Sequence, residues 1–186
     1  MAIANPPLRT FIAIPLARAL TTSLAEQVQQ QALSPPWHWI RPENWHLTLY
    51  FLGACSAEQR DALTRILDIR LSEQPGGQVA LTHWGGFPAA QGAARILAAQ
   101  GPADAPLQAL QSLIAESVSP FAEKPDYPHW KPHITLARAS RPAPATPPGG
   151  ALDLRMPATE VVLYSSERDH TGSRYTPLKR WALTTA

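Results

Sequence analysis

Features that mark several other protein classes are scarce in this sequence. Only one of its 186 residues is cysteine, so the chain can form no internal disulfide, which is typical of a reducing compartment. No stretch approaches the roughly 20 consecutive apolar residues that span a membrane. The apolar run at 11–17 is short, contains Pro15 and has no basic leader beyond Arg9, unlike a secretory signal. We therefore expect a soluble, cytoplasmic protein without a membrane partner.

Phosphate-binding loops and strong net charge are also lacking. The glycine pairs at 76–77 and 85–86 lack the spacing and the Lys-Ser/Thr pair of a P-loop, so we expect no use of ATP. The net charge of +2 excludes binding of nucleic acid through bulk charge. Arg outnumbers Lys by 13 to 3, which favours bidentate contacts with phosphate. Four cations near the C-terminus are either solvated or form an RNA-facing patch: Arg168, Arg174, Lys179 and Arg180.

The chain has enough apolar residues, 45%, for a proper core. Strand and helix patterns alternate and several neighbouring strands are linked as hairpins, so we predict an α+β fold with antiparallel sheets in one domain, 1–186. Residues 140–150, with four prolines and two glycines, are predicted to form a surface loop. Strands are expected at 10–14, 44–52 (ending at Gly53), 79–84, 94–98, 133–138, 159–165 and 174–183, with a short extended piece at 37–40. Helices are expected at 17–32, where apolar residues recur every four residues, from a capping box at Ser56 to about 74, and from an N-cap at Asp104 to Pro120.

Two short segments have nearly the same sequence, HLTL starting at His46 and HITL starting at His133. Their alternation predicts strands, in which residues i and i+2 share a face. Each segment then presents an imidazole and a hydroxyl together, His46 with Thr48 and His133 with Thr135. About 0.4 His-x-Thr triplets are expected by chance at this composition, so two in the same context indicate function. Facing each other, they would supply metal-free phosphoryl chemistry.

These motifs and their flanks resemble the 2H phosphoesterases, specifically the RNA 2',3'-cyclic phosphodiesterase (2'-5' RNA ligase) family. The resemblance implies a bilobal fold with two antiparallel sheets, each flanked by helices, a pseudo-two-fold arrangement and a central cleft. The sequence departs from the family at Trp37 to Trp39 and in the proline-rich stretch after Arg138. The segments that carry the resemblance are 9–15, 43–53, 85–88, 94–97, 131–138 and 162–165, followed by Gly172, Tyr175, Leu178 and Trp181.

The resemblance implies hydrolysis of RNA 2',3'-cyclic phosphate ends to 2'-phosphomonoesters. It assigns His46 as proton donor to the leaving O3' and His133 as the base that activates water. Ligation would be the same chemistry reversed, with a 5'-hydroxyl in place of water. Thr48 and Thr135 can donate hydrogen bonds to phosphoryl oxygens. We expect no metal, no cofactor and no ATP. The expected partners are oligonucleotides or RNA termini, for example those of tRNA fragments. The protein is expected to be a monomer.

Arg138 is the candidate phosphate clamp, because it matches the Arg that closes the family's second motif. Strict alternation turns Arg138 away from His133 and Thr135, so it reaches the site only if the strand bends, ends or bulges. An RNA base would need an aromatic platform. Alternation puts Tyr50 on the face of His46. The candidate aromatics are Phe11, Trp39, Tyr50, Tyr127 and Trp130.

Three other functions stay open. His129 and His133 have the spacing of a helical zinc pair, although Pro128 and Pro132 disfavour a helix there. A non-catalytic module that binds RNA ends would use the same side chains without turnover. A phosphodiesterase acting on 2',5'-linked oligonucleotides or small cyclic nucleotides would use the same chemistry. Turnover of an RNA ending in a 2',3'-cyclic phosphate distinguishes catalysis from binding.

Overall fold

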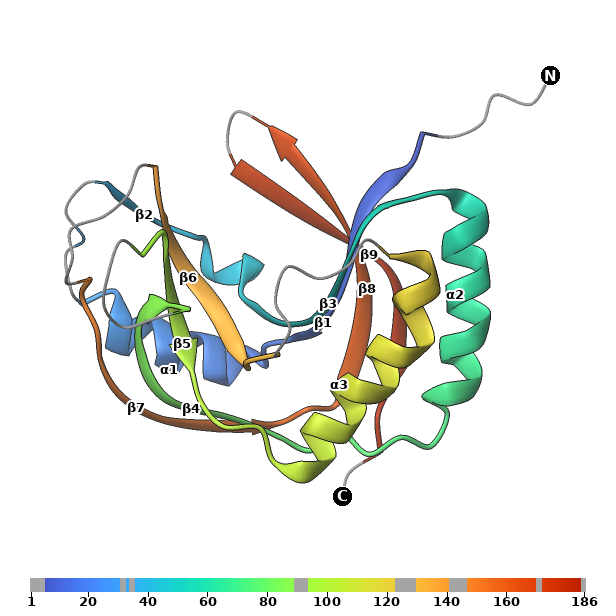
Figure 1. The fold of residues 1–186 in the computed structure, drawn as a ribbon. Helices are drawn as coiled ribbons and strands as arrows, with labels where there is room; N and C mark the ends of the chain where they lie inside the picture. The colour runs from blue at the N-terminus through green and yellow to red at the C-terminus, as the bar shows by residue number, and fades with distance from the viewer. Residues whose placement is uncertain are drawn as a thin grey trace.

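The computed structural model describes residues 6–30, 33, 36–88, 94–122, 130–140, 147–169 and 172–184. In these residues strands and helices alternate along the chain (Figure 1). The strands are β1 (Leu8–Pro15), β2 (Trp37–Trp39), β3 (His46–Cys55), β4 (Gln78–Phe87), β5 (Ile96–Gln100), β6 (His133–Ala139), β7 (Gly150–Pro157), β8 (Glu160–Asp169) and β9 (Gly172–Ala182). The helices are α1 (Arg18–Val28), α2 (Ala57–Arg70) and α3 (Ala105–Val118), with short 3-10 turns η1 (Pro42–Asn44) and η2 (Ser119–Phe121).

The described strands form a nine-stranded sheet in the order β7-β4-β5-β6-β3-β1-β8-β9, with β2 on β6. Every pairing between these strands is antiparallel, which confirms the predicted α+β class. The family resemblance implied two antiparallel sheets, whereas the described strands form one continuous sheet. The two halves of this sheet are joined where Leu47 of β3 pairs with Ile134 of β6. Both side chains are fully buried, so this junction is part of the core.

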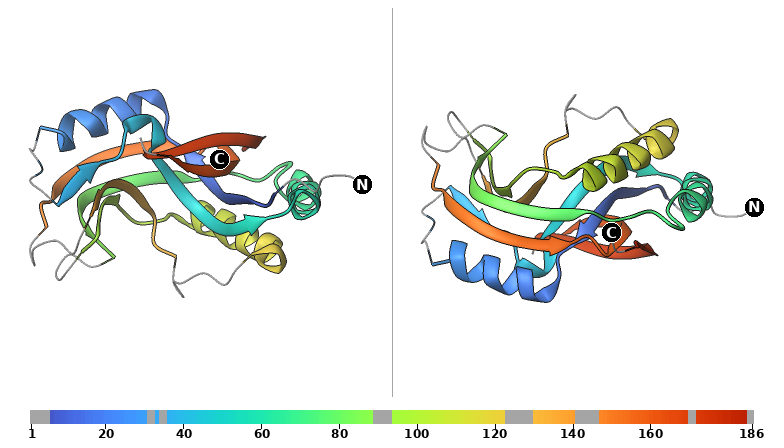
Figure 2. Two further views of the ribbon diagram at one scale, coloured as in Figure 1. Left: turned by 90° about the horizontal axis from the view of Figure 1, so that it is seen from above. Right: turned by 90° about the horizontal axis from the view of Figure 1, so that it is seen from below.

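The helices cover the sheet from both sides. Figure 2 shows α1 and α3 on opposite sides of the curved sheet, and α3 also packs on α2. Each helix buries one stripe, as its spacing predicted, because residues three and four apart share a face. Two predicted N-caps are confirmed: Ser56 forms a capping box with Gln59, and the Asp104 carboxylate accepts a hydrogen bond from the backbone N–H of Leu107. Buried members of these stripes include Leu20, Leu24 and Val28 of α1, Leu63 and Leu67 of α2, and Leu107, Leu110 and Ile114 of α3.

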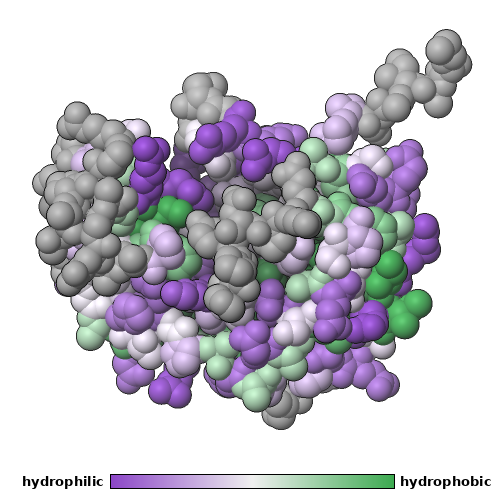
Figure 3. All heavy atoms as spheres, viewed as in Figure 1, coloured by the Kyte–Doolittle hydropathy of each residue, from purple (hydrophilic) through white to green (hydrophobic). Residues whose placement is uncertain are grey.

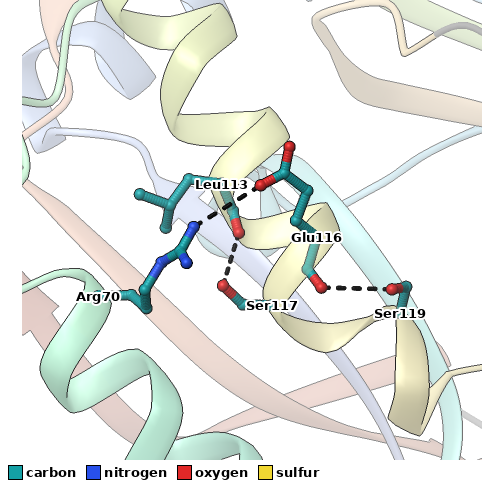
Figure 4. Close-up of polar contacts among 5 residues, drawn as sticks. All are labelled: Arg70, Leu113, Glu116, Ser117 and Ser119. Carbon is teal, nitrogen blue, oxygen red and sulfur yellow. Dashed lines mark hydrogen bonds and ion pairs between the residues drawn. The ribbon is translucent and has the colours of Figure 1, made fainter.

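Polar contacts on the outer side of α2 and α3 add little to this packing (Figure 4). Arg70 lies 3.7 Å from Glu116, and both side chains are largely exposed. Exposed pairs of this kind contribute at most about 1 kcal/mol. Ser117 donates to the carbonyl of Leu113 one turn earlier. The buried stripes therefore hold these helices in place.

Several elements differ from the sequence prediction, and the largest extension is that of β8, which was expected to end at 165 and continues to Asp169. β3 continues through Gly53, whose positive φ of 77° lets the strand shift register against β1 instead of ending. β7 was not predicted, although Leu152, Leu154 and Met156 alternate in it and Leu152 and Met156 are buried. Most of the predicted loop at 140–150 lies outside the described residues, and Gly150 already belongs to β7.

The described surface matches the composition. No helix in this part of the chain is both long and apolar enough to cross a bilayer. On the face drawn in Figure 3, hydrophilic residues predominate and apolar residues form small separate areas. Cys55, at the end of β3, is a free and fully buried thiol, as expected of a structural cysteine.

Candidate active site

The junction between the two halves of the sheet brings the two predicted motifs together. Antiparallel pairing of Leu47 with Ile134 sets His46 level with Thr135, and Thr48 level with His133. All four lie on the opposite face of their strands from the buried Leu47 and Ile134. Diagonal neighbours in an antiparallel pair lie about 7–8 Å apart, with their Cβ atoms somewhat closer, so the two imidazoles flank a space that suits one phosphate group.

Both imidazoles are held in the same orientation by the backbone. Nδ1 of His46 lies 2.7 Å from the carbonyl oxygen of Asn44, and Nδ1 of His133 lies 2.8 Å from that of Lys131. A carbonyl can only accept a hydrogen bond, so Nδ1 is the protonated nitrogen in each ring. Nε2 is therefore the atom left to accept or donate a proton in the site.

Burial makes both histidines harder to protonate. The pKa of His46 is lowered to about 4, chiefly because burial disfavours the charged ring, and further by the positive charges of His133 and Arg138. Burial also lowers the pKa of His133, with a smaller contribution from Arg138. The hydrogen bonds to the two carbonyls act in the opposite direction. Without a bound anion, both rings are mainly neutral at pH 7.

A bulge follows the threonine in each motif strand. In β6, Thr135 and Ala137 face the consecutive residues Ala98 and Leu97 of β5, so Leu136 is an extra residue. In β3, Leu49 is the extra residue in the same way, because Thr48 and Tyr50 face Ala13 and Ile12. Each bulge reverses the alternation of the residues that follow it.

The bulges decide where the later residues of each motif point. Arg138 is exposed while Leu136 and Ala137 are both buried, which fits a return of Arg138 to the face of His133. Strict alternation would turn Arg138 away from His133, and the bulge at Leu136 reverses that orientation. For Tyr50 the alternation argument was wrong: the bulge turns it into the core, where it is 8% exposed. Phe51, five residues after His46 as Arg138 is five after His133, is instead 57% exposed.

Aromatic side chains pack against both imidazoles. The ring of Phe11 lies 4.7 Å from that of His46, and Tyr175 contacts His46 edge-on at 5.2 Å. Phe87 stacks on His133 at 3.9 Å with an interplanar angle of 19°. Sequence reasoning named Phe11 only as a possible platform and missed Phe51, Phe87, Tyr164 and Tyr175. Two signals were available: the matched position of Phe51 and Arg138, and the presence of Phe87, Tyr164 and Tyr175 in the segments that carry the family resemblance.

The other aromatic candidates have structural contacts or are not described. Trp130 donates a hydrogen bond of 3.0 Å to the carbonyl of Thr48 and so links the start of β6 to β3. Trp39 packs near Trp84, with 6.2 Å between ring centroids. Tyr127 lies outside the described residues, as does His129 of the zinc alternative. Among the residues that are described, no group of three or more His, Cys, Asp or Glu is arranged to hold a metal.

Comparison with known proteins gives a family. Residues 20–170 match the 2'-5' RNA ligase superfamily. The chain belongs to this superfamily. It is 34% identical over 183 residues to the RNA 2',3'-cyclic phosphodiesterase of Escherichia coli, covering 97% of this chain and 99% of that protein. It is 31% identical over 182 residues to the protein of the same name from Thermus thermophilus, covering 95% of this chain and 90% of that protein.

Solved structures agree with this membership in the 2'-5' RNA ligase superfamily. The crystal structure of E. coli LigT complexed with 3'-AMP has a TM-score of 0.79 to this chain at 30% identity, and covers 96% of this chain and 99% of LigT. The similarity therefore extends over nearly the whole chain, and it confirms the family that the sequence motifs resemble.

Proposed function

We propose that this protein hydrolyses RNA ends carrying a 2',3'-cyclic phosphate and leaves a 2'-phosphomonoester. The observation that carries the proposal is the pair of Nδ1-anchored histidines at the junction of β3 and β6, with both Nε2 atoms left for one substrate. The names of the two curated relatives support the same substrate class. The protein is proposed to act as a single-domain, cytoplasmic monomer.

In the proposed reaction, water attacks phosphorus and the bond from phosphorus to O3' breaks. Nε2 of His133 accepts the proton of the attacking water, and Nε2 of His46 gives a proton to O3'. General acid–base catalysis of this kind contributes roughly 10² to 10⁴ in rate. The net change is addition of one water, and each imidazole returns to its first state by exchanging a proton with solvent.

The low pKa of His46 is compatible with its role as donor only when substrate is bound. A donor must carry its proton before the bond breaks, whereas burial lowers the pKa of His46 to about 4. The negative phosphate beside the ring favours the charged imidazolium and raises that pKa in the complex. Substrate binding thus promotes protonation of His46, which must carry a proton before it can donate one to O3'.

The remaining motif side chains stabilise the charge that builds on the phosphoryl oxygens. The hydroxyls of Thr48 and Thr135 would donate hydrogen bonds to these oxygens, and the Arg138 guanidinium would bind one of them as a charged donor. In the reverse direction, a 5'-hydroxyl would take the place of water and give a 2'-5' linkage. None of these steps requires a metal, a cofactor or ATP.

The test is incubation with an RNA oligonucleotide ending in a 2',3'-cyclic phosphate, with and without EDTA. We expect EDTA-resistant conversion to the 2'-phosphate, identified by separation from the 3'-phosphate standard. Binding without turnover would favour the module that only holds RNA ends. Faster turnover of 2',5'-linked oligonucleotides or small cyclic nucleotides would favour those substrates, and loss of activity in EDTA would favour a zinc enzyme.

A further inference from the structure

The β8–β9 hairpin extends beyond the rest of the sheet as a two-stranded arm (Figure 1). β1 pairs with β8 only from Ala13, opposite Val162, to Thr10, opposite Ser165. Beyond Ser165, β8 pairs with β9 alone. The arm begins beside the candidate site, because Tyr175 of β9 contacts His46.

One face of this arm continues the face of the active site. Tyr164, whose ring centroid is 6.3 Å from that of His46, alternates with Ser166 and Arg168 on the same face of β8. The register agrees, since Ser166 pairs with Tyr175, which contacts His46. Arg168 is four residues beyond Tyr164, about 13 Å along an extended strand.

The four C-terminal cations have different surroundings. Lys179 pairs with Asp68 at 2.9 Å, and Arg180 pairs with Glu160 at 2.8 Å. Arg174 lies opposite Glu167 in the hairpin, on the face turned away from Tyr175. Arg168 is exposed, and within the described part of the chain it has no ion pair.

We propose that Arg168 binds a backbone phosphate of the RNA strand that leads to the cyclic phosphate end. This inference rests on the proposed function, because a cyclic phosphate at O2' and O3' leaves the chain attached only through the 5' oxygen of the last nucleoside. An exposed guanidinium on the site face, about 13 Å along β8 from Tyr164 and about 7 Å along the hairpin from the level of Tyr175, suits a phosphate upstream of that nucleoside. The arm therefore makes the enzyme prefer polynucleotide ends to cyclic mononucleotides.

The arm is also tied to the candidate catalytic residue. The Asn44 side chain donates a hydrogen bond of 2.9 Å to the carbonyl of Ser173, which pairs with Arg168 across the hairpin. The carbonyl of the same Asn44 orients His46. A phosphate bound by Arg168 would thus lie on the β8–β9 hairpin, which Asn44 links to the His46 ring.

The test compares kcat/KM for a 2',3'-cyclic mononucleotide and for a tetranucleotide ending in the same nucleotide. Arg168→Ala is expected to lower the ratio of the tetranucleotide value to the mononucleotide value by about five- to tenfold at low salt. The dependence of log kcat/KM on log salt concentration for the tetranucleotide should become shallower by about 0.7, the loss of one contact with a single strand. Arg168→Lys should retain most of the salt dependence.

Arg174→Ala is the matched control, since it removes the same charge from the opposite face of the same hairpin. It should leave the substrate ratio within twofold of the wild type. Equal effects of the two substitutions, or equal loss on both substrates in Arg168→Ala, would overturn the role of Arg168. If the wild type hydrolyses neither substrate, the proposed function itself fails, and this inference fails with it.

Discussion

The two motif strands hold their histidines in the same way and surround them with different side chains. In both β3 and β6, Nδ1 bonds the carbonyl two residues earlier, and a bulge follows the threonine. On the β3 side, His46 lies among Phe11, Tyr164 and Tyr175. On the β6 side, His133 stacks on Phe87 and lies close enough to the Arg138 guanidinium for that charge to lower its pKa.

The difference suits a substrate that is itself asymmetric. A terminal nucleotide has a planar, weakly polar base on one side and charged phosphate on the other. The exposed Phe51 of β3 and the exposed Arg138 of β6 occupy matching positions, so one side offers stacking surface and the other positive charge. The two halves of one sheet thus present an aromatic side and a cationic side around the same pair of imidazoles.

The largest expected effect comes from removing either imidazole. We expect His46→Asn and His133→Asn each to lower kcat by roughly 10² to 10⁴, because each ring moves a proton in the same step. The measurement is single-turnover hydrolysis of an RNA 2',3'-cyclic phosphate, with thermal unfolding as a check that both variants fold. If His133→Asn kept most of the activity, His133 would have no part in the proton transfers, and the two motif strands would not be equivalent in function.

The threonines give a second comparison. Thr48→Val and Thr135→Val keep the side-chain shape but remove the hydroxyl, and each should reduce kcat by on the order of 10² to 10³ if it stabilises the transition state. Thr176→Val, at an exposed position of β9, is the control and should leave kcat unchanged. A rise in KM with unchanged kcat would show that the hydroxyls only bind the ground state.

The pH dependence follows from the surroundings of the two rings. Burial lowers both pKa values below the usual 6.5 in the free protein, to about 4 for His46. One ring must be neutral and the other charged, so kcat/KM, which reports the free enzyme, should peak below pH 6.5 and fall above the higher pKa. The bound phosphate raises both pKa values, so the optimum of kcat should lie at higher pH. Two profiles centred together above about pH 7 would contradict this.

Local patterns in the sequence predicted much of the fold that supports the site. The capping box at Ser56, the N-cap at Asp104 and the spacing of the buried leucines depend on neighbours within one turn, and each is confirmed. The two His-x-Thr segments lie on adjacent strands because the apolar residue inside each motif, Leu47 and Ile134, is buried at their junction. The caps, the helical stripes and the alternation within each motif are encoded within a few residues and are therefore visible without a structure.

The β-bulges that orient the site side chains could not be predicted from the sequence, because they depend on pairing with neighbouring strands. The bulges at Leu49 and Leu136 exist only relative to β1 and β5, and they reverse the faces assigned to Tyr50 and Arg138. Phe87 reaches His133 from β4, a strand that is distant in the sequence. Register across a sheet is set by long-range pairing, so alternation within one strand could not supply it.

The smallest expected effect concerns the anchors of the two rings. Asn44 uses its carbonyl to orient His46 and its side chain to bond Ser173 on the hairpin arm, whereas no such side-chain bond links Lys131 to another described element. Asn44→Ala should therefore lower kcat about two- to tenfold, the net value of one hydrogen bond, with little change in KM for a cyclic mononucleotide. Lys131→Ala should change kcat less than about twofold. If both substitutions reduced kcat equally, the hairpin arm would have no particular role in holding His46, and the anchoring of the two histidines would be equivalent in function as well as in geometry.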